Sequence, residues 1–227
     1  MVGTERGREL STQDRHRMTL RLLTIALALA LSSSGSAEVL GADENQENEE
    51  QPARTVDSIQ KGSTELALLG GFGIAHEIWD GVGDIRFYAV GVRVGRVMSN
   101  PMGPGFLRGN LEVSGEFLPV FLVDQGDTGY GASATFLARH FFAPGSRWRP
   151  YVVLGLGVLG TADEVPEGQT QLNFTPQIGL GISYSSSDRF VFYFDYRIHH
   201  ISNNGRKQPN PGINSSYLQF SVSILRW

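Results

Sequence analysis

Apolar and polar residues alternate with a period of two along most of the chain from residue 63 onward. This alternation is the pattern of β-strands with one apolar face and one polar face. It predicts eight strands, at residues 63–76, 84–98, 105–123, 128–142, 149–161, 169–185, 189–202 and 214–227. Turn-forming clusters such as Asp80-Gly81-Val82-Gly83 and Pro144-Gly145-Ser146 separate them. No amphipathic helix is evident after residue 63, so the predicted fold class is all-β.

The two faces of these strands differ in an informative way. In 169–185 one face is apolar (Leu172, Phe174, Ile178, Leu180, Ile182, Tyr184) and the other is small and polar (Gln171, Asn173, Thr175, Gln177, Gly179, Gly181, Ser183). A soluble sandwich usually exposes a face rich in Lys and Glu, whereas this chain has only two Lys, Lys61 and Lys207. Small polar residues suit the crowded interior of a narrow barrel. There, three arginines could pair with acidic residues (Arg93, Arg139 and Arg197 with Glu112, Glu116 or Asp195).

Every predicted strand is longer than the ~9–11 residues that cross a bilayer at a tilt. An eight-stranded barrel has an interior filled by side chains rather than an open pore. Residues 63–227 are therefore predicted to form an eight-stranded antiparallel transmembrane β-barrel of the outer membrane. The aromatic terminal residue, Trp227, fits such a barrel. The alternative is a secreted, soluble barrel of the lipocalin type that binds a ligand.

The N-terminus has the three parts of a secretory signal peptide. Arg15, Arg17 and Arg21 precede an apolar run at 22–31, and small residues follow up to Ala37. Ten apolar residues are too few to span a bilayer, which needs about 20. We expect a signal peptide at residues 1–37, with translation starting at Met1 or Met18. Residues 38–62 are rich in Glu, Asn and Gln with few large apolar groups, so we expect a disordered acidic leader.

Composition narrows the chemistry further. The 227-residue chain has no Cys, which excludes a disulfide scaffold, a thiolate metal site and a cysteine nucleophile. Its formal net charge of −4 argues against a nucleic-acid partner. The mean hydropathy of −0.14 excludes a bundle of transmembrane helices but not a barrel, whose strands alternate apolar and polar residues.

A serine and a histidine near the end of the seventh predicted strand could do chemistry together. His200 and Ser202 are two residues apart, so they lie on the same face of a strand, where a histidine can serve as the general base of a serine nucleophile. They share the parity of the apolar, outward face, as do Asn214 and Ser216 on the eighth strand. Polar groups that face lipid are costly. An enzyme would need this placement if its substrate were a membrane lipid. The other interpretation is that His200 and Ser202 begin an exposed loop.

Two stretches, His200-Ile201-Ser202-Asn203 with Gly205 and Pro209-Asn210-Pro211-Gly212-Ile213-Asn214-Ser215, resemble the lipid A 3-O-deacylase (PagL) family of outer-membrane acyl hydrolases. The resemblance implies an eight-stranded outer-membrane barrel with an outward-facing site. It implies that Ser202 attacks the ester carbonyl at position 3 of lipid A, with His200 as general base. Asn203 would help to stabilise the oxyanion, a role that matters in acyl transfer. The implied enzyme is a carboxylic ester hydrolase that acts on lipopolysaccharide and needs no cofactor or metal. A homodimer is left open.

One position departs from the family pattern. The family's orienting acid is a Glu that would fall where Asn214 stands. Asn can accept a hydrogen bond from the imidazole and fix its tautomer, but it cannot stabilise the imidazolium by charge. Loss of a triad carboxylate can cost about 10⁴ in kcat. Three outcomes follow: a working Ser-His-Asn enzyme, an acid supplied from elsewhere, or an inactive relative. The rival to an enzyme is an inactive, structural outer-membrane barrel.

Overall fold

The computed structural model describes residues 59–187 and 190–227. The expected signal peptide at 1–37 lies outside the described residues, as does the expected leader apart from residues 59–62. The described residues form one closed antiparallel sheet, because β1 pairs with β9 and β4 pairs with β5. Its strands are β1 (Thr64–His76), β2 (Arg86–Val97), β3 (Gly109–Asp124), β4 (Thr128–Phe142), β5 (Trp148–Val165), β6 (Thr170–Phe174), β7 (Gln177–Ser185), β8 (Val191–Ile201) and β9 (Ile213–Arg226).

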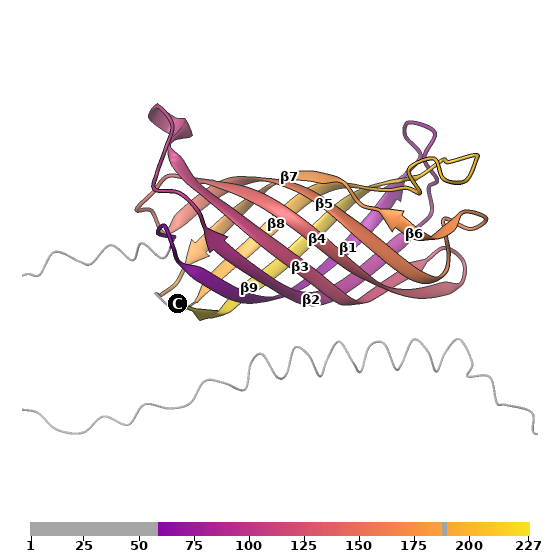
Figure 1. The fold of residues 1–227 in the computed structure, drawn as a ribbon, viewed down its shortest axis with the longest axis horizontal. Helices are drawn as coiled ribbons and strands as arrows, with labels where there is room; N and C mark the ends of the chain where they lie inside the picture. The colour runs from indigo at the N-terminus through magenta and orange to yellow at the C-terminus, as the bar shows by residue number, and fades with distance from the viewer. Residues whose placement is uncertain (1–58, 188–189) are drawn as a thin grey trace, which may run out of the picture. The chain divides into compact units, whose positions relative to one another are not determined.

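The wall of the barrel consists of eight strands, as the alternation predicts, when β6 and β7 are counted as one interrupted strand. Both β6 and β7 pair with β5, and only Thr175 and Pro176 separate them. Pro has no N–H to donate to the sheet, which explains the break within the predicted strand at 169–185. A short 3₁₀ turn, η1 (Gly105–Leu107), precedes β3 where the sequence predicted the start of a strand. Figure 1 shows the strands tilted around the barrel, with β6 and the loops after β1 and β8 at one end.

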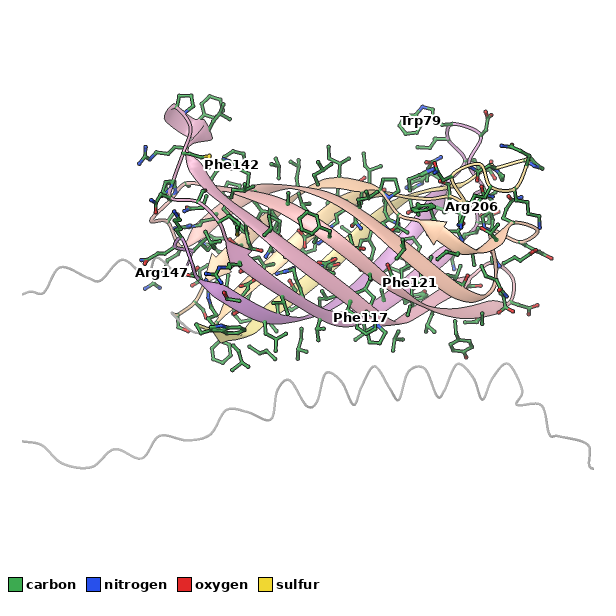
Figure 2. All side chains as sticks on the ribbon, viewed as in Figure 1. Trp79, Phe117, Phe121, Phe142, Arg147 and Arg206 are labelled. Carbon is green, nitrogen blue, oxygen red and sulfur yellow. The ribbon has the colours of Figure 1, made fainter. Side chains whose placement is uncertain are left out.

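The outer wall is apolar. Leu154, Leu156 and Leu180 are each more than 60% exposed, and Figure 2 shows side chains standing out all along the wall. A soluble lipocalin-like barrel would present polar residues on this surface, so the structure argues against that alternative. Within residues 59–187 and 190–227, no helix has the length and hydrophobicity needed to cross a membrane.

The interior is filled by buried charges between two apolar clusters. Arg197 contacts Glu116 at 2.9 Å and Asp195 at 3.2 Å, and Arg139 pairs with Glu112. These are the predicted partners. Glu65 is a further partner that was not predicted, and it lies 3.0 Å from Arg139 and 3.3 Å from Arg93. Its position near the start of β1 left it outside the predicted set, although its inward parity was readable.

A β-bulge in β3 shows where simple parity fails. Phe117 and Phe121 have the same parity, yet Phe117 is 52% exposed whereas Phe121 is buried (labelled in Figure 2). The register between β3 and β4 shifts between Leu118 and Phe121. A bulge adds one residue to one strand and so exchanges the two faces beyond it. Pro119 lies at this shift, where a missing N–H is tolerated.

One apolar cluster packs inside the barrel beneath the strand ends that carry His200 and Asn214. Ile201 and Ile213 are fully buried in it, together with Phe87 and Tyr217. Because Ile201 and Ile213 point inward, the residues next to them in each strand point outward. The side chains of Tyr151 and Tyr217 are also buried inside the barrel.

Candidate active site

His200 and Asn214 are paired on the outer face where β8 meets β9. The two residues are register partners, and His200 Nδ1 lies 2.7 Å from Asn214 Oδ1. His200 is half-buried and Asn214 is 6% exposed. Strand parity predicts that both residues face outward, and the structure brings them into hydrogen-bond contact.

The loop after β1 fixes the orientation of the Asn214 amide. Asn214 Nδ2 donates to the carbonyl oxygen of Ile78 at 2.7 Å. A carbonyl only accepts, so the NH₂ group must face Ile78 and Oδ1 must face His200. Oδ1 in turn only accepts, so Nδ1 of His200 carries the proton. The other ring nitrogen, Nε2, is then the unprotonated one in the neutral imidazole and is available to take a proton.

Two glycines let the backbone come close to these side chains. A Cβ at Gly81 would lie 2.5 Å from Asn214 Nδ2, and a Cβ at Gly212 would lie 2.8 Å from His200 Cε1. Gly212 also has a φ of +67°, which other residues rarely adopt. The two loops that carry these glycines are joined by a hydrogen bond from the Val82 N–H to the Gly212 carbonyl at 3.0 Å. The loops therefore form one support for the His200–Asn214 pair.

Ser202 lies just past β8, held against β6. Its N–H donates to the Phe174 carbonyl at 3.1 Å, and the Phe174 N–H donates to the Ser202 carbonyl at 2.8 Å. The side chain is 8% exposed, and its hydroxyl makes no hydrogen bond with any described residue, His200 included. The backbone of Ser202 is thus fixed while its hydroxyl is left unengaged.

Asn203 is bound into the loop between β8 and β9. Its Nδ2 donates to Gln169 Oε1 at 3.1 Å and to the Lys207 carbonyl at 3.0 Å. Its own N–H donates to Asn210 Oδ1 at 3.3 Å. Asn203 is 1% exposed. Its amide is thus engaged with the β5–β6 turn and with its own loop rather than offered to the outer face.

Two features of this region were not predicted from the sequence. Ile78, which orients Asn214, lies in a loop and has no periodic signal. The second feature is a pair of contacts of Ser216, which parity places on the outward face. Its hydroxyl is hydrogen-bonded to His76 in β1 and to Tyr196 in β8, the strands on either side of β9. The outward parity of Tyr196 and the strand-end position of His76 were readable signals. Among the described residues, no group of three or more His, Asp or Glu side chains is arranged to hold a metal ion.

Similarity to known proteins shows which family the chain belongs to. The family model described as lipid A 3-O-deacylase (PagL) matches residues 108–223, just over half of the chain. The chain belongs to the PagL family. Lipid A deacylase PagL of Pseudomonas aeruginosa is 33% identical over 107 residues, which are 44% of this chain. The match spans 59% of that relative's length.

The fold can be compared with solved structures. The crystal structure of the outer membrane enzyme PagL matches with a TM-score of 0.50 and 21% identity, over 68% of this chain and 97% of that one. The N-terminal β-barrel domain of Pseudomonas aeruginosa OprF matches with a TM-score of 0.49 and 16% identity, over 74% and 98%. This PagL-family chain is thus an eight-stranded outer-membrane β-barrel. His200, Ser202 and Asn214 all fall within the stretch that the family model matches.

Proposed function

We propose that this barrel is a hydrolase that removes the ester-linked acyl chain at position 3 of lipid A. The observation that carries the proposal is the His200–Asn214 pair, which faces outward beside Ser202 and has its donor and acceptor roles fixed by Ile78. The curated PagL relative is named as a lipid A deacylase. A site on the outer wall suits a substrate that itself lies in the membrane.

The proposed reaction uses the unprotonated Nε2 of His200 as the base. Ser202 Oγ attacks the ester carbonyl, and its proton passes to His200 Nε2. His200 then gives this proton to the departing sugar oxygen, which leaves an acyl group on Ser202. A water molecule, activated by the same nitrogen, releases the fatty acid and restores the serine. In the absence of substrate, catalytic hydrogen bonds are often not yet formed. We propose that lipid binding brings the Ser202 hydroxyl to Nε2.

Asn214 sets a limit on the rate. It fixes Nδ1–H, which is the orienting half of the role of a triad acid, but it adds no negative charge beside the imidazolium. The imidazolium formed after the attack is therefore less stabilised than it would be beside a carboxylate. Asp195 does not replace that carboxylate, because it is buried inside the barrel against Arg197 and Tyr151. We expect a working but slow Ser-His-Asn enzyme.

Asn203 remains our proposed source of oxyanion stabilisation. To donate with its side chain, its amide would have to release Gln169 or the Lys207 carbonyl when lipid binds. Deacylation by Asn203→Ala tests this role. We expect a fall in kcat of about 10²-fold if the amide reaches the oxyanion. An unchanged kcat would restrict Asn203 to a structural part in the loop.

The function is tested by mass spectrometry of lipid A from cells that express the wild type or Ser202→Ala. We expect the wild type to remove one ester-linked acyl chain from position 3, and Ser202→Ala to remove none. Both proteins must reach the outer membrane for the comparison to count. Loss of the same chain with Ser202→Ala would contradict the proposed nucleophile.

An inactive structural barrel is the second candidate, favoured by the missing carboxylate at Asn214 and the unengaged Ser202 hydroxyl. Asn214→Glu separates the two candidates in the same experiment. Deacylation only with Asn214→Glu would mean an enzyme scaffold that has lost its acid. No deacylation with the wild type or Asn214→Glu would support the structural barrel.

We also propose that the chain is exported through a signal peptide at residues 1–37. The disordered leader expected at 38–62 must end before residue 59, because Ile59 is buried in an apolar cluster with Leu137 and Phe141 and the Gly62 N–H donates to the Val97 carbonyl. The support for the signal peptide is the order of basic, apolar and small residues before Glu38. N-terminal sequencing of the protein from outer membranes is expected to begin at Glu38. A mature protein that retains residues 22–31 would contradict the cleavage.

A further inference from the structure

The loop between β2 and β3 carries three exposed apolar side chains at the end of the barrel opposite the proposed active site. Met102 is 48% exposed, Leu107 45% and Phe106 88%. We call residues 98–108, which include η1, the η1 loop. Figure 2 shows it standing out from the wall beside Phe142. Large apolar side chains that gather on an exposed surface mark a site of contact with a lipid, a ligand or another protein.

Hydrogen bonds hold the η1 loop in this position. The Met102 N–H donates to the Gly109 carbonyl at 2.8 Å, and the Gly109 N–H donates to the Met102 carbonyl at 2.9 Å. His140 Nε2 donates to the Leu107 carbonyl at 3.1 Å, which ties the loop to β4. Phe106 lies between these anchored points, so the fold itself presents its side chain outward.

An apolar hollow of about 530 Å³ lies between the η1 loop and the turn after β4. This volume is within the range of sites that bind small molecules. Pro150, in its lining, shares the outward face of β5 with Val152, and both are exposed. The apolar outer wall therefore continues from the hollow toward the middle of the barrel. The apolar lining residues are Phe106, Leu107, Phe142, Ala143, Pro144 and Pro150.

Arg108 also lines the hollow and brings a positive charge to it. Its side chain is exposed, and it has no hydrogen bond or ion pair with any residue of 59–187 or 190–227. A guanidinium group matches the geometry of a phosphate, which it can bind through two parallel hydrogen bonds. Arg108 thus offers an unused phosphate-binding group beside an apolar hollow.

The charge at this end of the barrel has one sign. Lys61, Arg96 and Arg147 are exposed here, whereas no Asp or Glu side chain is exposed at this end within the described part of the chain. Exposed acidic side chains lie at the opposite end instead, as at Asp80. Basic residues near a membrane surface attract anionic lipids. The end that carries the hollow is therefore complementary to an anionic head group.

Strand length places the hollow near the lipid head groups. β4 has 15 residues, which at ~3.3 Å per residue and a tilt of ~40° cover about 38 Å along the barrel axis. The hydrocarbon core is about 30 Å thick, so the strand ends reach the head groups on both sides. Lipid A, the substrate of the proposed active site, is a lipid of the outer leaflet. The opposite end then lies in the periplasmic leaflet, which consists of glycerophospholipids.

We propose that the hollow beside the η1 loop binds an anionic glycerophospholipid of the periplasmic leaflet. Arg108 holds the phosphate, and an acyl chain enters the hollow and continues along the outward face of β5. A zwitterionic phospholipid has the same phosphate and chains, but its cationic group is repelled by the basic end. The inference rests on the proposed function for the orientation of the barrel, whereas the binding itself can be measured without any hydrolysis.

The first test compares two lipids that differ in the head group alone, dipalmitoylphosphatidylglycerol and dipalmitoylphosphatidylcholine, by native mass spectrometry of the purified protein in detergent micelles. We expect the wild type to bind the phosphatidylglycerol more tightly. Arg108→Gln should weaken that binding about tenfold, the effect of one hydrogen bond to a charged group. The matched control is Arg147→Gln, which removes the same charge at the same end but outside the hollow, and it should weaken binding much less.

Equal weakening by Arg108→Gln and Arg147→Gln would mean a diffuse attraction to the basic end and would overturn the proposal. Equal binding of the two lipids by the wild type would overturn it as well. Phe106→Ala should weaken the binding of both lipids alike, because they have the same acyl chains. No effect of Phe106→Ala on either lipid would contradict an acyl chain in the hollow.

The second test locates the lipid. A phosphatidylglycerol with a diazirine in one acyl chain is photo-crosslinked to the protein in micelles, and the adducts are mapped by peptide mass spectrometry. We expect adducts in residues 105–108 and 142–152, reduced in Arg108→Gln. Adducts spread evenly around the wall would mean a shell of unspecific lipid and would overturn the proposal. Deacylation of lipid A without the expected adducts refutes this inference alone, whereas adducts in a protein that deacylates nothing refute the proposed function alone.

Discussion

Asn214 has two hydrogen bonds that together determine which nitrogen of His200 can act as a base. The Ile78 carbonyl takes its NH₂ group at 2.7 Å, and its oxygen faces His200 Nδ1 at 2.7 Å. A glutamate at this position would place a carboxylate oxygen, rather than a donor, against Ile78. The local structure is therefore built around an amide. The sequence identified the residue and its departure from the family pattern, but Ile78 could be found only in three dimensions.

Asn214→Ala is expected to lower kcat for lipid A deacylation by about 10²-fold. This is less than the ~10⁴ lost when an asparagine in place of the triad aspartate imposes the wrong tautomer, because alanine imposes no tautomer. The measurement is single-turnover deacylation by the purified barrel, with Ser202→Ala as the inactive reference. A rate equal to that of the wild type would mean that Asn214 does not orient His200.

The strands and the loops differ in how far sequence could predict them. The alternation of apolar and polar residues located all eight strands of the wall and predicted that His200 and Asn214 face outward, because side chains two residues apart in a strand point to the same face. It failed at the β3 bulge, where Phe121 points inward. The loops have no such repeat. The contact between the loops after β1 and after β8, through Val82 and Gly212, depends on barrel closure and was not predictable.

Gly81→Ala is expected to lower kcat about tenfold while the barrel still folds. The added Cβ would lie 2.5 Å from Asn214 Nδ2 and 2.9 Å from the Ile78 carbonyl oxygen, so the loop must move and the hydrogen bond that orients Asn214 must weaken. A net hydrogen bond contributes about 1 kcal/mol, which is roughly five- to tenfold in rate.

Deacylation rates of Gly81→Ala are compared with those of Gly115→Ala. Gly115 also lies in the wall, and a Cβ there meets nothing within 4 Å. Folding of both variants is checked by heat-modifiable electrophoretic migration. Equal rates in the two variants would show that the loop after β1 does not support the site.

The interior of the barrel is filled by side chains, and its outer wall is apolar. Its buried arginines and acids link β1, β2, β3, β4 and β8 across the interior, and apolar clusters pack on either side of them. Composition predicted such pairing because a narrow barrel must satisfy its inward charges. The partner choices, Glu65 above all, depended on strand register. The proposed catalytic groups thus lie on a packed scaffold, with their substrate approaching from the membrane side.

Glu65→Ala is expected to destabilise the barrel by about 3–5 kcal/mol, because removing one partner of a buried ion pair leaves the other charges uncompensated. Glu65 contacts Arg93, Arg139 and the Tyr193 hydroxyl. Urea unfolding in lipid vesicles, followed by tryptophan fluorescence, measures the change. The control is Glu164→Ala, whose pair with Lys207 is solvent-exposed and should contribute less than about 1 kcal/mol. Equal stability changes would contradict a structural role for the buried network.

Covalent labelling tests the central claim, that Ser202 is a nucleophile activated by His200 on the outer wall. The purified barrel is treated in micelles with a long-chain fluorophosphonate, and the adduct is located by peptide mass spectrometry. We predict one adduct, on Ser202, which disappears in Ser202→Ala and forms much more slowly in His200→Ala. An unmodified protein, or an adduct on Ser216 in place of Ser202, would contradict the account.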